Sequence, residues 1–370
     1  MTDSINDLLP EGLADRLPPL AGQAAHIARA MLDRMDSHGY DRVHPPLIEF
    51  EKSLAGRMDG VQPRQMFRFV DPRSLRMLAL RSDMTVQIGR IAATGLAAAP
   101  RPLRLCYAGP VARMTGDQLD PSRENMQLGA ELIGRDNVAA AAEMVCLAIE
   151  ALKAAGASGI SVDFTLPDLV DTLAREALPL AGGQIDAVRR ELDAKDAGGL
   201  RDAGGEAYVP LLYATGPFDE AIEKLAAIDA GGALASRIAG LREIAARAAG
   251  KARLTLDPSE RHGFEYQSWF GFTLYAEGVR GVLGRGGTYH IHGADEPATG
   301  FSLYPEQLAE ALAGTAEPRP RLFLPLGHDT DTAARLRETG WRTVAALDES
   351  DDPATLGCTH RLDGSAPVAV

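Results

Sequence analysis

The stretch from Arg101 to Gly134 constrains the fold most strongly, because it has the pattern of one long β-hairpin. Its first arm, Leu103 to Val111, is a run of aliphatic, aromatic and β-branched residues without helical periodicity. A polar segment with several turn-forming residues follows, from Met114 to Ser122. From Arg123 onward hydrophobic and polar residues alternate, as in a strand with two different faces. We therefore expect the rest of the chain to be organised around this hairpin.

One face of the second arm carries an unusual set of side chains. Gln127 and Glu131 share that face, roughly 13 Å apart at about 3.3 Å per residue, and Gly129 lies between them. A glycine inside a strand leaves room for another group to approach the sheet. Two interpretations remain open at this point. The face is either solvated, or it is the floor of a pocket for a small polar, cationic ligand.

Composition limits the classes of function. The chain has 370 residues, of which 45% are hydrophobic, so it is long enough for one large domain and a smaller one. Its net charge of −13 argues against nucleic acid as the main partner, because a surface that binds the phosphate backbone should be basic. The N-terminus has no signal-peptide pattern, and no apolar run approaches the ~18 residues that span a bilayer. We expect a cytoplasmic protein without a membrane partner.

Cysteines and histidines give no sign of a metal or disulfide site. Cys106, Cys146 and Cys358 are scattered, without a metal-binding spacing, which suits a reducing compartment. His290 and His292 form the single close histidine pair, and we see no third ligand for it. We therefore expect neither a metal nor a disulfide framework.

Other segments alternate between helical and extended patterns. Helices are predicted where hydrophobic residues recur at helical spacing, and strands where short apolar or β-branched runs occur between turn signals. The predicted helices are 23–38, 86–95, 137–155, 305–313 and 332–340. The predicted strands outside the hairpin are 65–70, 76–80, 160–164, 253–257, 269–275, 321–326 and 342–347.

Two parts of the chain differ from this core pattern. Residues from about 165 to 250 are rich in Ala, Leu, Arg and Glu, are interrupted by paired glycines and carry no chemical motif, so we expect a helical insertion used for packing or docking. A proline-containing linker, 315–320, follows the core, 1–315, and precedes a small α/β tail, 321–370. The residues by themselves predict an α+β fold with a ligand-bearing sheet.

Several motifs resemble those of the class II aminoacyl-tRNA synthetases, in the order found in histidyl-tRNA synthetases. The hairpin, from Gly109-Pro110-Val111-Ala112-Arg113 to Gln127-Leu128-Gly129-Ala130-Glu131, resembles motif 2. Residues 40–50 resemble motif 1, which builds the dimer interface in that family, and residues 300–308 stand where motif 3 should be. The resemblance covers residues 1 to about 315. It implies a mainly antiparallel sheet flanked by helices, and a homodimer core.

The resemblance also implies a pocket for an amino acid. Asp83 and Thr85 match an acidic residue and a threonine that hold the amino group in the synthetases, although Asp83 is also a natural helix N-cap. Both roles are compatible, and an acid with a hydroxyl two residues later suits an ammonium group. Arg113 matches the arginine that contacts the carboxylate. The candidate histidine-binding residues are Asp83, Thr85, Arg113, Gln127, Glu131, Tyr266, Gln267 and Tyr289.

Departures from the synthetase pattern fall on the ATP and phosphate contacts. His262 stands in place of a catalytic arginine, and Gln307 in place of the ATP-stacking arginine of motif 3. In the synthetases the loop of motif 2 contacts adenine, and this chain has Met114-Thr115-Gly116 in its place. Neither glutamine nor a mostly neutral histidine reproduces the permanent charge and rigid donor fork of arginine. We therefore expect no catalytic residues and no cofactor.

A histidyl-synthetase core without ATP chemistry, and with a tail too small for an anticodon-binding domain, resembles the regulatory subunits of ATP phosphoribosyltransferase. The resemblance implies a homodimer that pairs with a short-form catalytic subunit, in a hetero-octamer, and gates the first step of histidine biosynthesis and its feedback control by histidine. The alternatives are an active histidyl-tRNA synthetase and a related adenylate-forming ligase on the same fold.

Overall fold

The chain divides into two compact units, Met1–Ala313 and Gly314–Val370. In this computed structural model the described residues are 9–55, 65–116, 121–228, 230–261, 267–291, 296–313 and 320–370.

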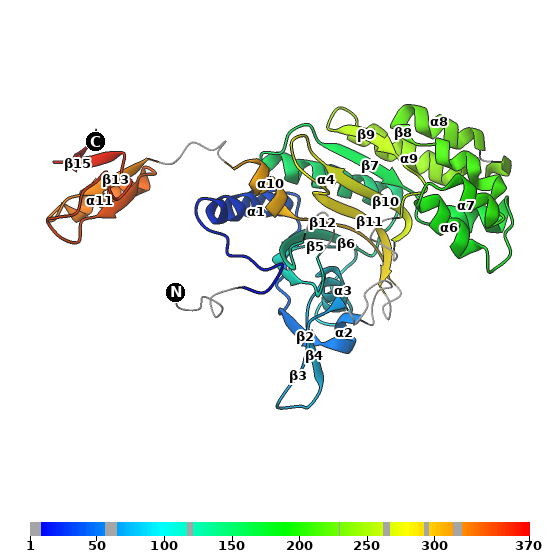
Figure 1. The fold of residues 1–370 in the computed structure, drawn as a ribbon, viewed down its shortest axis with the longest axis horizontal. Coiled ribbons are helices and arrows are strands. Elements are labelled where there is room, and N and C mark those ends of the chain that lie inside the picture. Colours follow the sequence, from blue (N-terminus) through cyan, green and yellow to red (C-terminus); the bar gives the residue numbers. More distant parts are fainter. Residues whose placement is uncertain are drawn as a thin grey trace, which may run out of the picture. The chain divides into compact units, whose positions relative to one another are not determined.

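The first unit is built on a nine-stranded sheet (Figure 1). Its strands are β1 (Asp41–Arg42), β5 (Leu103–Ala112), β6 (Glu124–Ile133), β7 (Ser161–Thr165), β8 (Gly216–Pro217), β9 (Arg253–Leu256), β10 (Gln267–Tyr275), β11 (Gly284–Ile291) and β12 (Glu296–Leu303). They lie in the order β1-β5-β6-β12-β11-β10-β7-β9-β8, antiparallel except for the pairs β1–β5 and β7–β9. The predicted hairpin is confirmed as β5 and β6, and so is the mainly antiparallel sheet.

One face of this sheet is covered by helices. These are α1 (Leu20–Ser37), α4 (Val138–Ala154) and α10 (Pro305–Ala311). Leu128 and Ala130 of β6 pack into their hydrophobic core, together with Met31 of α1. Helix α4 begins where predicted, because the Asn137 side chain accepts a hydrogen bond from Ala140 N at 3.0 Å. The structure therefore buries the apolar face of β6 and leaves the opposite face for other groups.

Helix α3 (Thr85–Ala93) lies on that opposite face. Its Val86 and Ile88 pack in a second hydrophobic cluster with Tyr107 of β5. Beside α3 is a small three-stranded sheet of β2 (Ile48–Phe50), β4 (Met77–Leu80) and β3 (Arg68–Val70), and the short helix α2 (Glu51–Ala55) directly follows β2. Arg90 of α3 donates to Glu49 of β2, with Nη2 and Oε1 2.6 Å apart. Helix α3 thus connects the large sheet to the small one.

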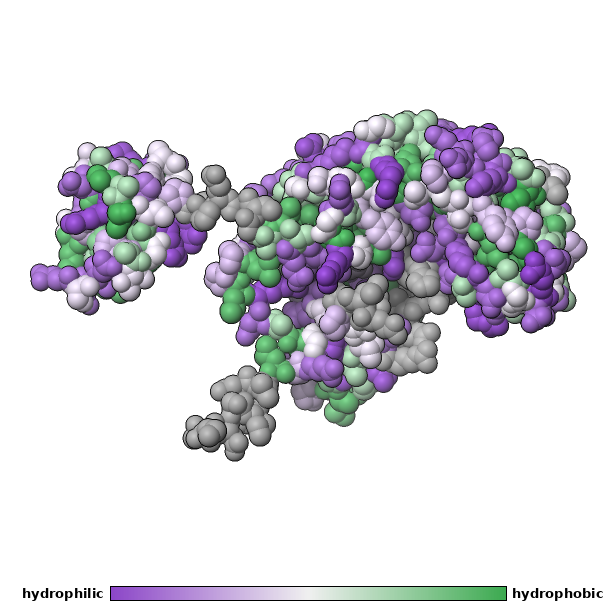
Figure 2. Space-filling model, turned by 45° about the horizontal axis from the view of Figure 1, so that its top comes forward, coloured by the Kyte–Doolittle hydropathy of each residue, from purple (hydrophilic) through white to green (hydrophobic). Residues whose placement is uncertain are grey.

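The predicted insertion between β7 and β9 is helical. Its elements are α5 (Leu169–Glu176), α6 (Ile185–Asp193), α7 (Ala197–Asp202), η3 (Glu206–Tyr213), α8 (Phe218–Ile228), η4 (Ala230–Gly232) and α9 (Ala235–Ala248). They gather at the β9–β8 end of the sheet (Figure 1). The face of the molecule in Figure 2 is mainly hydrophilic, with hydrophobic residues in small groups. Among the described helices, none is both long and apolar enough to cross a membrane.

The described part of the second unit, 320–370, contains a four-stranded sheet and one helix. Its elements are β13 (Arg321–Leu324), α11 (Thr330–Glu338), β14 (Arg342–Ala345), β15 (His360–Asp363) and β16 (Ala366–Ala369). The first strand, the helix and the second strand agree with the sequence predictions. The hairpin of β15 and β16 was not predicted. Its residues are mostly exposed, and Leu362 is its one buried side chain, so it has no clear hydrophobic pattern.

Candidate ligand-binding site

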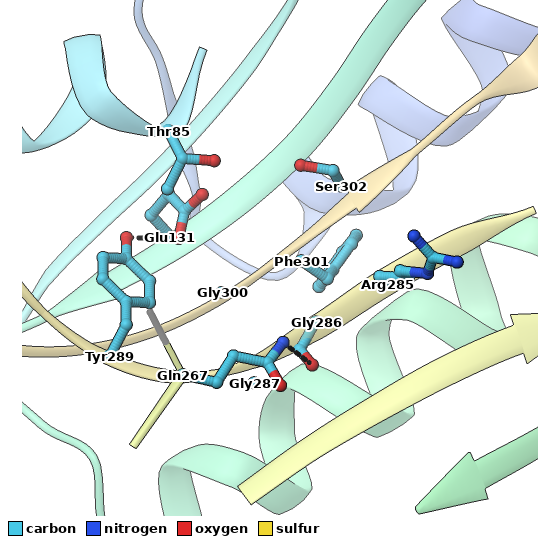
Figure 3. A pocket seen from close by; sticks show the side chains of 10 residues that line it. All are labelled: Thr85, Glu131, Gln267, Arg285, Gly286, Gly287, Tyr289, Gly300, Phe301 and Ser302. Carbon is cyan, nitrogen blue, oxygen red and sulfur yellow. Dashed lines mark hydrogen bonds between the residues drawn. The ribbon is translucent and has the colours of Figure 1, made fainter. Parts of the chain in front are cut away.

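A pocket lies on the α3 side of the nine-stranded sheet (Figure 3). Its lining residues come from α3, β6, β10, β11 and β12, and they are Thr85, Glu131, Gln267, Arg285, Gly286, Gly287, Tyr289, Gly300, Phe301 and Ser302.

Glycines form the floor of the pocket. Gly300 pairs in register with Glu131 on one side and with Gly287 on the other, and Gly287 pairs with Gly271. A Cβ atom on Gly300 would overlap the Glu131 carboxylate, and one on Gly287 would lie 2.7 Å from Cδ of Gln267. The polar side chains can lie over the sheet only because these positions have no side chains of their own.

Glu131 is the centre of a buried hydrogen-bond network. It is 1% exposed, and its carboxylate accepts from the hydroxyls of Tyr107 at 3.1 Å and Tyr289 at 2.7 Å. Burial raises the pKa of Glu131 to about 8, although both hydroxyl bonds favour the ionised form. A cationic group placed beside this carboxyl would restore its charge. The chemistry of the pocket therefore favours a ligand with a basic, hydrogen-bonding group.

Gln127 connects the sheet to the start of α3. Its side-chain oxygen accepts from Met84 N at 2.9 Å, and its nitrogen donates to Asp83 Oδ2 at 3.1 Å. The other oxygen of Asp83 accepts from Thr85 N at 2.7 Å, so this carboxylate supports the first turn of α3. Gln127 is fully buried, which excludes a solvated face at this end of β6. These bonds hold the Thr85 side chain at the pocket wall.

The structure brings most of the sequence-predicted binding residues together. Asp83 and Gln127 are not in the lining, but they are joined to each other and to the start of α3 by the bonds above. Four of the predicted residues line the pocket itself, namely Thr85, Glu131, Gln267 and Tyr289.

The two remaining predicted residues are Arg113 and Tyr266. Arg113 follows the end of β5 and is exposed, with its guanidinium 3.5 Å from both the Ser82 carbonyl and the Tyr304 hydroxyl. Tyr266 lies outside the described residues, and so does His262.

Sequence reasoning missed two hydroxyl groups of the site. The Tyr107 hydroxyl lies 3.2 Å from Ser302 Oγ and 3.4 Å from Thr85 Oγ1, and Ser302 also accepts from Gln127 at 2.7 Å. Tyr107 is paired in register with Gly129, where a Cβ atom would collide with its hydroxyl. At Gly129 we expected another group to approach the sheet, and that group is the side chain of Tyr107 on the neighbouring strand. Alternation along the first arm of the hairpin would have placed Tyr107 on this face.

The segment at the motif 3 position, 300–308, lines the pocket through Gly300, Phe301 and Ser302, whereas its second half, 305–308, is not part of the lining. Pro305 occupies the first turn of α10, as predicted. Glu306 pairs with Arg16, with Oε1 and Nη1 3.0 Å apart. In the amide orientation that satisfies both of its polar atoms, Gln307 donates to the Arg280 carbonyl at 2.6 Å. Gln307 is thus engaged with the turn between β10 and β11.

The fold and this site define a protein of the class II aminoacyl-tRNA synthetase type. A family model described as "Histidyl-tRNA synthetase" matches residues 12–308. An ATP phosphoribosyltransferase regulatory subunit/histidyl-tRNA synthetase from Bacillus halodurans has the same fold, with a TM-score of 0.81 at 24% identity over 96% of this chain and 97% of that one. Histidyl-tRNA synthetase from Nostoc sp. PCC 7120 has a TM-score of 0.77 at 16% identity, over 96% and 90%.

Relatives of higher sequence identity narrow this class. The ATP phosphoribosyltransferase regulatory subunit of Rhodospirillum centenum is 44% identical over 96% of this chain and 95% of its own. That of Paramagnetospirillum magneticum is 44% identical over the whole of both chains, and that of Rhodospirillum rubrum is 40% identical over 98% and 97%. The chain belongs to the ATP phosphoribosyltransferase regulatory subunit family, which confirms the resemblance found in its motifs.

Proposed function

We propose that this chain is the non-catalytic regulatory subunit of an ATP phosphoribosyltransferase, and that it gates the first step of histidine biosynthesis in response to histidine. The observation that carries the proposal is similarity, at up to 44% identity and along the whole chain, to proteins named as such subunits. A subunit of this name requires a catalytic partner. We propose a short-form ATP phosphoribosyltransferase, assembled with this chain in a hetero-oligomer.

The residues at the motif 3 position support a site that no longer uses ATP. Gln307 gives its side-chain hydrogen bond to the Arg280 carbonyl, and it brings no permanent charge. The groove that Gln307 lines is net acidic, which disfavours a triphosphate. Its acidic residues are Glu11, Asp15, Glu124, Glu306 and Glu310, against the basic residues Arg16 and Arg280.

The pocket supports histidine as the regulatory ligand. We place the imidazole against Glu131 and Tyr289, because a buried carboxyl and a hydroxyl suit a ring that is both basic and a donor. We place the α-amino group at the start of α3, near Thr85, Asp83 and Gln127. Tyr266 and Gln267 belong to the same proposed set. The chain would then sense the end product of the pathway that its partner begins.

The proposal is tested by reconstitution. The purified chain is mixed with the short-form catalytic subunit encoded by the same genome, and phosphoribosyl transfer to ATP is followed with and without histidine. We expect a stable complex whose activity differs from that of the catalytic subunit alone and falls when histidine is added. Recovery of tRNA in place of the catalytic subunit, in a complex strongly sensitive to salt, would favour the synthetase alternative.

A further inference from the structure

The pocket contains a permanent positive charge that the synthetase motifs did not predict. Arg285 shares a strand face with Gly287 and Tyr289, because alternate residues of β11 point to the same side. It is paired in register with Ser302 of β12. Figure 3 shows Arg285 at the opposite end of the pocket from Glu131, beyond Ser302. The pocket therefore has a carboxyl group at one end and a guanidinium group at the other.

The groups at these two ends complement a short zwitterion. Glu131 and Arg285 are two strands and two residues apart in the sheet, which separates their Cα atoms by about 12 Å at roughly 3.3 Å per residue and 4.8 Å per strand. Both side chains extend from these positions over the sheet, and Figure 3 shows them in the same pocket. Histidine has a basic imidazole for the carboxyl end and a carboxylate for the guanidinium end, so its polar groups match the two ends of the pocket. The positions between the two ends, Gly287 and Gly300, have no side chains of their own, and the side chains of Gln267 and Glu131 lie over them.

The arginine at the motif 2 position is less favourably placed. Arg113 is exposed and is absent from the pocket lining, whereas Arg285 is part of it. Both arginines act electrostatically on Tyr304. Arg113 lies 3.5 Å from its hydroxyl, and burial raises the pKa of Tyr304 while the charges of both arginines oppose that rise. Of these two arginines, Arg285 is the one that lines the pocket.

We propose that Arg285 binds the carboxylate of the amino-acid ligand and so determines that the pocket takes an amino acid and not the corresponding amine. The inference rests on the proposed function, because it assumes that histidine enters this pocket. It adds a residue that the synthetase pattern does not assign to that role. A charge-assisted, bidentate bond is the interaction that arginine provides and that glutamine cannot replace.

Calorimetric titration with two ligands tests the inference. Histidine and histamine, which lacks the carboxylate, are titrated into the full chain, into Arg285→Gln and into Arg113→Gln. We expect the unmodified chain to prefer histidine by roughly 10- to 100-fold. Arg285→Gln should lose this preference while binding histamine as before, and Arg285→Lys should retain part of it. Histamine binding shows that the variant pocket is folded. Arg253→Gln, at an exposed arginine of β9, serves as the matched control and should behave like the unmodified chain.

Three results would overturn the inference. If Arg285→Gln keeps the full preference for histidine, this arginine does not bind the carboxylate. If Arg113→Gln loses the preference instead, the carboxylate belongs to the motif 2 arginine. If the unmodified chain binds neither ligand at millimolar concentration, the proposal of a histidine pocket fails, and this one fails with it.

Discussion

Tyr289 of β11 donates a 2.7 Å hydrogen bond to Glu131 of β6, across the intervening strand β12. The bond passes over Gly300, which has no side chain to block it. Two residues separated by more than 150 positions in the sequence are therefore held together in one site. The predictions below depend on this arrangement.

Replacing the carboxyl group should weaken ligand binding. We expect Glu131→Gln to reduce histidine affinity by roughly 10- to 100-fold, because a hydrogen bond to a charged group contributes about 1.5–3 kcal/mol. Calorimetric titration measures the effect. Glu124→Gln, at an exposed position of the same strand, is the control and should leave the affinity unchanged. Equal affinities for the unmodified chain and Glu131→Gln would show that this carboxyl does not hold the ligand.

The ligand-free chain should lose stability as the pH rises. Burial raises the pKa of Glu131 from 4.5 to about 8, so between these values the folded state binds more protons than the unfolded state. The corresponding contribution to stability is complete below pH 4.5 and is lost as the pH rises through about 8. Urea unfolding at several pH values between 5 and 8 measures the slope. We expect a shallower slope in Glu131→Gln, and identical slopes would contradict the assignment.

The pocket floor should not tolerate a side chain. Gly300→Ala places a Cβ atom onto the Glu131 carboxylate, so we expect destabilisation of about 1–3 kcal/mol together with loss of histidine binding. Thermal unfolding and titration measure the two effects. Gly182→Ala is the matched control, because a Cβ there meets no atom within 4 Å. The control should change the unfolding free energy by less than about 0.5 kcal/mol. Unchanged stability and binding in Gly300→Ala would mean that the floor can move.

The chain should not activate histidine. We expect no histidine-dependent exchange of pyrophosphate into ATP, because Gln307 and the loop Met114-Thr115-Gly116 supply no cation for the phosphates. Restoring one arginine through Gln307→Arg should not produce exchange, since the acidic residues of the surrounding groove remain. An active histidyl-tRNA synthetase assayed in parallel provides the positive control. Exchange at the rate of that control would support the synthetase alternative.

The local sequence pattern predicted the strands that form the site better than it predicted which residues line the site. The hairpin was found from alternation, and its strands end within about one residue of the predicted positions. Gln127 and Glu131 were placed on one face because alternation is a property of a single strand. Arg285 and Ser302 were missed because their place in the same pocket as Glu131 depends on the order of β6, β12 and β11. That order is set by tertiary packing, and no short stretch of sequence encodes it.

Helix α3 has one further consequence for how a bound ligand could be felt elsewhere. Thr85, at its first turn, lines the pocket, and Arg90, less than two turns later, holds Glu49 of the small sheet. Thr85 and Arg90 are about 7.5 Å apart along the helix axis, at roughly 1.5 Å per residue. A shift of α3 at Thr85 would therefore be felt at the ion pair between Arg90 and Glu49. The helix links the pocket to the small sheet through two side chains of one short element.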